Sequence, residues 1–300
     1  MHVPVLLKEV IELLNPQPNE NFVDCTYGFG GHAAAILQKT GPAGKVLGIE
    51  IDEEKVKNQK LKIKSFSERI ILVNGSYADL EEIVNRENFG PINGILLDLG
   101  MSSWDVEESG RGFSFNRNEP LDMRYSAESQ KIKVKSDVTA QEIVNGWREE
   151  ELARIFRDFG QERFYRGIAE KIARARAKKP IKTTFQLTEI IKSAIPKKFH
   201  FGKTHPATRT FQALRIAVNN ELGNLAAVLP QALEALEKEG RLAVISFHSL
   251  EDKIVKNFFR EKAKQGQLTI LTKKPSNAQK AEINNNPRAR SAKLRAIVRI

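Results

Sequence analysis

The first hundred residues alternate short apolar runs with helical stretches of mixed polarity. The apolar runs lack the strict polar–apolar alternation of half-exposed strands, and this is typical of a parallel sheet covered on both faces. The predicted strands are Phe22–Thr26, Lys45–Glu50, Arg69–Val73 and Gly94–Asp98, with helices at His32–Gln38 and Glu53–Phe66. This βαβ order predicts a doubly wound, Rossmann-like α/β sheet.

The strand pattern stops after about residue 105 and returns near residue 240. The helices predicted in between are Ala140–Trp147, Glu150–Phe159, Gln161–Ala177 and one long helix from about Thr208 to Leu236. Strands at Arg241–Phe247 and Leu294–Ile300 complete the sheet, and Lys274–Arg290 is predicted to be irregular and mobile. We therefore predict an inserted, all-helical domain of residues 106–204 within a discontinuous sheet domain of residues 1–105 and 205–300.

The composition indicates a globular, cytoplasmic protein. Of the 300 residues, 41% are hydrophobic and 28% are charged, which is ordinary globular usage. No apolar run approaches the roughly 18 residues that span a membrane, and Met1–Pro18 lacks the apolar core of a signal peptide. Because Cys25 is the single cysteine, no internal disulfide is possible. The histidines lack short metal-ligand spacing, so we expect no structural metal.

The net charge of +11 is concentrated in two segments. Arg163–Lys203 holds twelve basic residues against two acidic ones, and Lys273–Ile300 holds eight against one. Such clusters favour a polyanionic partner such as RNA, although exposed helix faces also carry charge runs. The candidate RNA contacts are Arg174, Arg176, Lys178, Lys179, Arg288 and Arg290. Arg295 either contacts phosphate or solubilises the last strand.

A glycine-rich turn follows the first predicted strand. Gly28, Gly30 and Gly31 lead into His32, and glycines there allow positive φ and close approach of a ligand. The spacing differs from the G-x-G-x-x-G of dinucleotide enzymes. Glu50 ends the second strand, where a carboxylate accepts hydrogen bonds from ribose hydroxyls, or serves only as a charge near a helix N-terminus.

Asp98 ends the fourth predicted strand after four apolar residues. Since an unpartnered charge at that edge is costly, a functional role is favoured. Tyr77, after the third strand, either stacks near an adenine or packs into the core. His248 and Ser249 precede a helix, and Ser249 with Asp252 fits a helix N-cap pairing, with a substrate role as the alternative.

Several sequence blocks together point to one family. In chain order they are His2–Leu7, Gly28–His32, Gly94–Gly100, Arg111–Phe115, Pro120–Arg124, His205–Arg215, Ser246–Asp252 and Asn286–Ser291. Across nearly the whole chain, these blocks resemble the ribosomal small-subunit RNA cytosine-N4 methyltransferases, the MraW/RsmH family.

The resemblance implies an enzyme that uses S-adenosylmethionine (SAM) and acts on ribosomal RNA of the small subunit. It implies cofactor contacts at Gly30, Gly31, His32, Glu50, Tyr77 and Asp98. The family usually has Asp at the position of Glu50, and both residues present a carboxylate. A further contact is implied at position 105, where Trp104-Asp105 replaces the family's Pro-Gln.

The chemistry of an exocyclic cytosine amine makes Asp98 the candidate catalytic residue. The amine is a poor nucleophile, so the enzyme has to hold the base outside its stack and accept the amine's hydrogens. Asp98 and the Leu99 carbonyl are the candidate acceptors, and a role of Asp98 on the cofactor stays open. The alternatives are a methyltransferase for another RNA or a protein, an NAD-dependent dehydrogenase, and a non-catalytic RNA-binding assembly factor.

Overall fold

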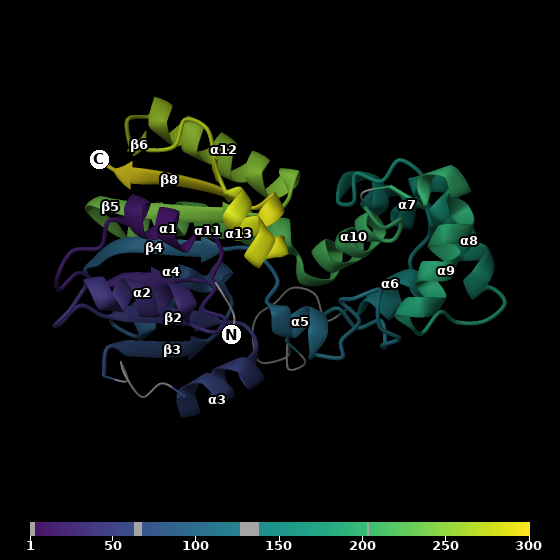
Figure 1. Cartoon of the computed structure of the whole chain (residues 1–300), viewed down its shortest axis with the longest axis horizontal. Coiled ribbons are helices and arrows are strands. Elements are labelled where there is room, and N and C mark those ends of the chain that lie inside the picture. Colours follow the sequence, from purple (N-terminus) through teal and green to yellow (C-terminus); the bar gives the residue numbers. More distant parts are fainter. Residues whose placement is uncertain (1–3, 63–67, 127–137, 203) are drawn as a thin grey trace. The chain divides into compact units, whose positions relative to one another are not determined.

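The computed structural model describes residues 4–62, 68–126, 138–202 and 204–300 (Figure 1). The chain divides into two compact units: a sheet unit of Met1–Gly100 with Leu222–Ile300, and a helical unit of Met101–Glu221. The start of the first family-like block (residues 2 and 3) and the end of the helix predicted from Glu53 (residues 63–66) lie outside the described residues.

The sheet unit contains a mixed sheet whose strand order is β3-β2-β1-β4-β5-β8-β6, with β7 paired to β8. The strands β3, β2, β1, β4 and β5 are mutually parallel, and β8 runs antiparallel to β5, β6 and β7. The strands are β1 Phe22–Asp24, β2 Val46–Glu50, β3 Ile70–Asn74, β4 Ile92–Asp98, β5 Leu236–Ser246, β6 Leu268–Ile270, β7 Ser276–Asn277 and β8 Lys293–Arg299. The predicted doubly wound sheet is confirmed, and β6 and β7 are additions to it.

Helices cover both faces of this sheet (Figure 1). Neighbouring residues of one strand belong to opposite apolar cores: Leu96 packs in the core beneath α1 and α2, and Leu97 in the core beneath α4, α11 and α12. This double burial explains why the strands are continuously apolar. The helices are α1 Leu7–Leu14, α2 Gly31–Lys39, α3 Glu53–Lys62, α4 Leu80–Arg86 after the 3-10 turn η1 Tyr77–Asp79, α11 Glu221–Ala235, α12 Ser249–Lys264 and α13 Lys280–Asn285.

The described elements of the helical unit are helices and turns, with one isolated β-bridge between Pro120 and Thr183. They are α5 Ser103–Glu107, α6 Ala140–Gly146, α7 Glu149–Asp158, α8 Tyr165–Arg176, α9 Thr184–Ala194, the 3-10 turn η3 Lys197–Phe199 and α10 Thr208–Asn219. A single core joins them, with Phe156, Ile172 and Leu214 fully buried. The predicted inserted domain stops at residue 204, whereas this unit continues to Glu221 because α10 packs against α7.

Three family-like blocks meet inside the helical unit. The Phe115 ring stacks on His205 with centroids 4.4 Å apart. The Asn219 amide donates to the Met123 carbonyl at 2.7 Å, and Arg215 forms a bidentate pair with Glu221 at 2.7 and 3.0 Å. These contacts join the two ends of the unit's chain, so the blocks have a structural role that their sequence alone does not reveal.

The predicted long helix from Thr208 to Leu236 is wrong in its continuity. Asn220, at φ 48°, ends α10 in the left-handed region, and α11 starts at the next residue. Asparagine tolerates this conformation better than most residues. The apolar residues on either side of it pack in different cores, those of α10 in the helical unit and those of α11 in the sheet unit.

The predicted irregularity of Lys274–Arg290 is also wrong. The segment forms β7, α13 and the 3-10 turn η4 Pro287–Ser291. Its Glu282 carboxylate accepts a hydrogen bond of 2.7 Å from the backbone N–H of Leu6, which is 276 residues away in the sequence. This long-range contact fixes the segment against the start of the chain.

Candidate active site

The strand order places a topological switch point between β1 and β4. From β1 the chain builds β2 and β3 toward one edge, and later adds β4 and β5 on the other side. Open α/β sheets bind their ligands at the carboxyl ends of the strands beside such a switch. Asp24 ends β1 and Asp98 ends β4, so two acids flank this point.

The glycine turn after β1 is shaped by the protein's own packing. Gly28 and Gly30 have φ of 53° and 74°, which glycine adopts at no steric cost. A Cβ on Gly30 would lie 2.5 Å from the Tyr27 hydroxyl, and one on Gly31 would lie 2.4 Å from Pro4 Cγ. Tyr27 is therefore an organiser of the turn that the sequence analysis missed, since nothing in its spacing marks it.

Glu50 links the end of β2 to the glycine turn. Its Oε2 accepts from the Gly28 N–H and its Oε1 from the Asp52 N–H, both at 2.9 Å, and the Lys55 Nζ lies 4.0 Å from Oε1. The residue is 7% exposed. Glu50 therefore ties the end of β2 to the glycine turn, and its predicted contact with ribose hydroxyls stays a prediction.

Asp98 carries a buried carboxylate oxygen. Oδ1 is enclosed and has no hydrogen-bond partner among the described residues, although the side chain as a whole is 19% exposed. Burial raises the pKa of Asp98 to about 7; the Gly100 N–H opposes this shift and the charge of Glu251 adds to it. Its backbone N–H donates to the Thr26 hydroxyl at 2.6 Å, so β1 positions the residue. A buried acceptor without a partner is typical of a ligand site.

His32 lies beside Asp98 but does not form an ion pair with it at neutral pH. Its Nε2 is 3.0 Å from the Val5 carbonyl, which assigns the ring proton to Nε2. Burial lowers the pKa of His32, so the neutral ring turns an unprotonated Nδ1 toward the Asp98 Oδ2, 3.9 Å away. The start of the chain thus sets the tautomer of this histidine.

Asp24 is the third titratable group at this edge. It is 1% exposed, and burial raises its pKa to about 6, while the proximity of His32 lowers it. Its Oδ1 accepts from the Thr26 N–H at 3.2 Å. The structure therefore gathers Asp24, His32 and Asp98 at the switch point, of which the sequence analysis proposed only the last two as site residues.

Two further predicted contacts have structural roles of their own. Tyr77, in η1 after β3, packs partly buried against the core beneath α4. Asp105 caps α5: its Oδ2 accepts from the Ser102 N–H at 2.8 Å and from the Ser102 hydroxyl at 2.6 Å. Asp105 is only 2% exposed. The cofactor contacts predicted for both residues stay predictions.

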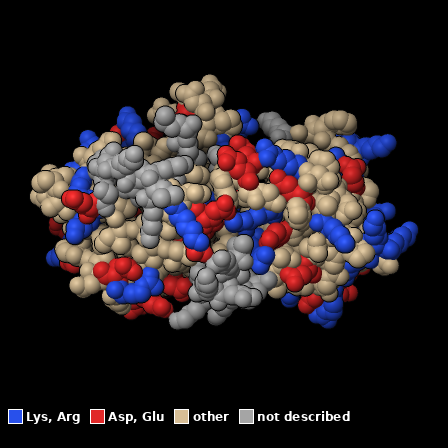
Figure 2. Space-filling view, turned by 90° about the horizontal axis from the view of Figure 1, so that it is seen from below, with Lys and Arg blue, Asp and Glu red and all other residues tan. Residues whose placement is uncertain are grey.

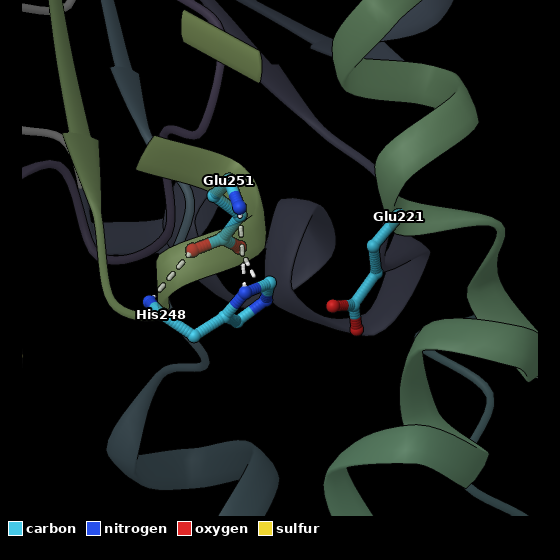
Figure 3. Close-up of side chains that lie close together, drawn as sticks. All are labelled: Glu221, His248 and Glu251. Atoms are coloured by element: carbon cyan, nitrogen blue, oxygen red, sulfur yellow. Dashed lines mark hydrogen bonds and ion pairs between the residues drawn. The ribbon is translucent and has the colours of Figure 1, made fainter. Parts of the chain in front are cut away.

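His248 caps α12, and its partner is Glu251 rather than a residue of the predicted pair Ser249–Asp252 (Figure 3). Glu251 Oε2 accepts from the Phe247 and His248 N–H groups at 2.8 and 3.2 Å, and His248 Nδ1 accepts from the Glu251 N–H at 3.4 Å. The His248 Nε2 lies 3.2 Å from Glu251 Oε1 without the alignment of a hydrogen bond. Glu221, also drawn, is the last residue of the helical unit.

Asp252 instead binds the last strand. Its Oδ1 lies 2.6 Å from the Arg295 Nε, and its Oδ2 lies 3.5 Å from the Lys293 Nζ. Arg295 is 7% exposed, so the predicted solubilising role is wrong, and the predicted phosphate contact stays a prediction. The pair is separated by 43 residues, and no sequence spacing indicates it.

The predicted RNA contacts differ in their surroundings. On the helical unit, at the right of Figure 2, Lys and Arg side chains project from the surface. Lys178 and Lys179 are exposed after α8, and Arg174 is exposed beside Glu170. Arg176 instead donates to the Val144 carbonyl at 2.7 Å and thereby caps α6. In the sheet unit, Arg290 is exposed and Arg288 is half-buried in η4.

The fold defines the class of protein: it is a Rossmann-like α/β protein with an inserted helical unit. A Rossmann-like sheet carries buried acids at its switch point, and a helical unit is inserted in the connection from β4 to β5. Among the described residues, no helix is both long and apolar enough to cross a membrane.

The sequence pattern of the MraW methylase family matches residues 1–300, so the chain belongs to that family. It is 44% identical to the ribosomal RNA small subunit methyltransferase H of Syntrophotalea carbinolica, over 100% of this chain and 98% of that one. The protein of the same name from Heliobacterium modesticaldum is 45% identical, over 100% and 98%.

A likeness in fold extends to an rRNA methylase from Streptococcus thermophilus. That solved structure is 10% identical, with a TM-score of 0.44 over 98% of this chain and 93% of the other.

Proposed function

We propose that the chain transfers the methyl group of SAM to the exocyclic N4 amine of a cytosine in small-subunit ribosomal RNA. The observation that carries the proposal is the buried Asp98 carboxylate, unpartnered at Oδ1 among the described residues, beside the glycine turn of a MraW-family methylase. The names of its relatives indicate small-subunit ribosomal RNA as the substrate. The family resemblance indicates cytosine as the base and N4 as the methylated atom.

The acids at the strand ends fit SAM. SAM carries an ammonium group, a sulfonium centre and a ribose with two hydroxyls, and it supplies an electrophilic methyl group. The Asp98 carboxylate would hold the ammonium group, because it is enclosed and lacks a protein partner at Oδ1 among the described residues. Glu50 would accept the ribose hydroxyls, since it lies at the end of β2 and its Oε2 already contacts the glycine turn at Gly28.

The chain's own residues have to orient the amine and accept a proton. In the transfer, a bond forms between N4 and the methyl carbon, the carbon–sulfur bond breaks, and N4 loses one proton. Asp98, with a pKa of about 7, is matched to accept a proton near neutral pH. The Leu99 N–H donates to the Ile245 carbonyl at 3.0 Å, which fixes the backbone at Leu99. The Leu99 carbonyl would accept a hydrogen bond from the amine and orient it, and the proton itself would leave to a carboxylate or to water.

Mass spectrometry of ribosomal RNA from cells that lack the protein tests the proposal. We expect small-subunit RNA to lose the mass of one methyl group on a cytosine, and purified protein with SAM to restore it. Calorimetry with SAM and NAD separates the alternatives, because a dehydrogenase would bind NAD and a non-catalytic factor neither. Unchanged RNA mass together with absent SAM binding would overturn the proposal.

A further inference from the structure

The turn after α9 exposes two aromatic side chains. Phe201 is 91% exposed and Phe199 is 39% exposed. Scattered exposed apolar residues are common, but a phenylalanine that is almost wholly in water and lies two residues from a second exposed one is unusual. The exposure alone names no partner, so the side chains around these rings have to identify it.

Cations lie beside the Phe199 ring and beside its neighbour, the Phe164 ring. The Phe199 ring lies 5.3 Å from that of Phe164, and the Arg163 guanidinium lies 5.6 and 5.7 Å from the two ring centroids. The Lys198 Nζ lies 5.3 Å from the Phe199 centroid. These are cation–π distances, so the charges are held next to apolar ring faces.

The turn that carries the rings is anchored from behind. The His200 Nε2 lies 3.1 Å from the Lys192 carbonyl and 2.8 Å from the Ile195 carbonyl at the end of α9. The Phe199 N–H donates to the Pro196 carbonyl at 2.9 Å. Phe201 directly follows this anchored turn, and the anchoring lowers the entropic cost of binding a ligand against the rings.

The charge within the turn itself has one sign. Residues 196–202 contain Lys197 and Lys198 and no acidic residue, and both lysines are exposed. Interleaved cations and exposed rings match a strand that presents phosphates and unpaired bases. We propose that this aromatic–basic surface, formed by Arg163, Lys197, Lys198, Phe199 and Phe201, binds single-stranded RNA, and that Phe201 stacks on an unpaired base.

This inference rests on the proposed function and specifies the form of its substrate. Methyl transfer to a cytosine amine requires the base to lie outside a helical stack. The nucleotides that flank such a base are single-stranded or easily unpaired, so the protein needs a surface that distinguishes unpaired bases from a duplex. A ring face does so, because every unpaired base offers a π-face that a duplex hides.

The test measures binding of the full chain to a fluorescein-labelled, single-stranded RNA oligonucleotide and to its duplex. Phe201→Ala should weaken single-strand binding about fivefold to 100-fold, the measured range for one stacked base. Phe201→Trp should restore binding, since it keeps a stacking ring. Lys197→Ala with Lys198→Ala should instead flatten the slope of log K against log salt by about 1.4, because each phosphate contact contributes about 0.7.

Phe185→Ala is the matched control, because Phe185 is 46% exposed on α9 of the same unit but lies outside the surface. It should bind RNA as the wild type does, and SAM binding should be unchanged in every variant. The inference would be overturned if Phe201→Ala bound single-stranded RNA as tightly as the wild type does. It would also be overturned if Phe201→Ala and Phe185→Ala lost equal amounts of single-strand affinity. If Phe201→Ala lost binding to a protein partner but bound RNA as the wild type does, the surface would be a protein interface and the inference would be wrong.

Failure of the inference is distinguishable from failure of the proposed function. If small-subunit RNA is methylated but Phe201→Ala binds single strands normally, only the surface is wrong. If no cytosine is methylated but Phe201→Ala still loses single-strand binding, the surface stands and the proposed reaction is wrong.

Discussion

The charged groups at the carboxyl edge of the sheet are buried, whereas those on the surface of the helical unit are exposed to water. At the edge, Asp24 and Asp98 are withdrawn from water and their pKa values are raised to about 6 and about 7. On the helical unit, Lys178, Lys179 and Arg174 are exposed to solvent. Low dielectric strengthens each interaction at the edge, whereas water and salt screen the surface. Cofactor binding should therefore depend on single residues and on pH, and RNA binding on sums of charges and on salt.

The largest effect is expected from Asp98→Asn, which keeps the shape but removes the charge. If Asp98 holds the ammonium group, SAM binding should weaken by about 1.5–3 kcal/mol, the range for a hydrogen bond to a charged group. If it acts on the amine, SAM should bind well and the single-turnover methylation rate should fall by about a hundredfold or more. Calorimetry and rapid-quench kinetics distinguish the two, and we expect the first.

A conservative control accompanies this substitution. Asp158→Asn removes a carboxylate whose side chain is 45% exposed and paired with its neighbour Arg157, on a helix of the helical unit. It should leave both SAM binding and the rate unchanged. Wild-type SAM affinity and wild-type rate in Asp98→Asn would contradict both roles and the location of the active site.

Glu50→Ala should weaken SAM binding by about 1–3 kcal/mol, the cost of leaving hydrogen-bonding groups unpaired. Part of that loss should come from the glycine turn, because Gly28 donates to Glu50 at 2.9 Å. Glu50→Gln keeps an acceptor for one of the two backbone groups and should lose less. Calorimetry with SAM and an RNA-binding assay measure the two effects, and RNA affinity should stay intact. Equal SAM affinity in wild type and Glu50→Ala would remove the ribose assignment.

The pH dependence tests the same edge with a smaller effect. Burial raises the pKa of Asp98 from 3.8 to about 7, so the carboxylate is half-protonated near neutral pH without a ligand. A cation prefers the ionised form, so SAM should bind about tenfold more tightly at pH 8 than at pH 6 through this group. The difference between wild type and Asp98→Asn isolates the contribution of Asp98 from that of SAM's own amine. The same dependence in both proteins would contradict the assignment.

Protein stability should move the other way with pH. Because the folded pKa of Asp98 lies above the unfolded value, the contribution of this group to stability is fully present below about pH 4. That contribution is lost as pH rises through about 7. Urea unfolding without SAM should show a smaller decrease in Asp98→Asn than in wild type, because Asp24, whose pKa is raised to about 6, contributes its own decrease in both proteins.

The smallest effects are expected from the exposed cations. Neutralising Arg174, Lys178 and Lys179 should weaken RNA binding modestly and flatten its salt dependence, since fewer counterions are released. Arg176→Ala should instead cost about 1 kcal/mol of stability, because it removes a hydrogen bond to the Val144 carbonyl. Salt titration of RNA affinity and chemical unfolding measure the two. An unchanged salt slope would assign the three cations to a solvated helix face.

The sequence predicted those parts of the protein that local patterns determine. Continuous apolar runs predicted the strands β1 to β4, because burial on both faces leaves no polar alternation. The prediction of one long helix was wrong at Asn220, where a single residue in the left-handed region separates α10 from α11. An asparagine inside a helical pattern has no local mark that distinguishes a tolerated residue from a break.

The candidate site was predicted where a residue type at a strand end has a direct chemical meaning, as for Glu50 and Asp98. It was missed where distant residues cooperate. Val5 orients His32, and Asp252 binds Arg295, and both pairings depend on the tertiary fold. The cap of α12 was misassigned because histidine is an uncommon capping residue, and Ser249 offered a more usual one.

The insertion between β4 and β5 also has a consequence for how the chain folds during synthesis. Asp98 of β4 pairs with Ile245 of β5. This pairing cannot form until the entire helical unit and α11 have been synthesised. The helical unit needs only its own continuous stretch of chain, and its core is complete before β5 emerges. We therefore expect the nascent protein to contain a folded helical unit and a half-built sheet with an open strand edge, a species prone to association with other chains. Mutations in β5 or α11 should reduce the yield of folded protein more than equally buried changes in the helical unit.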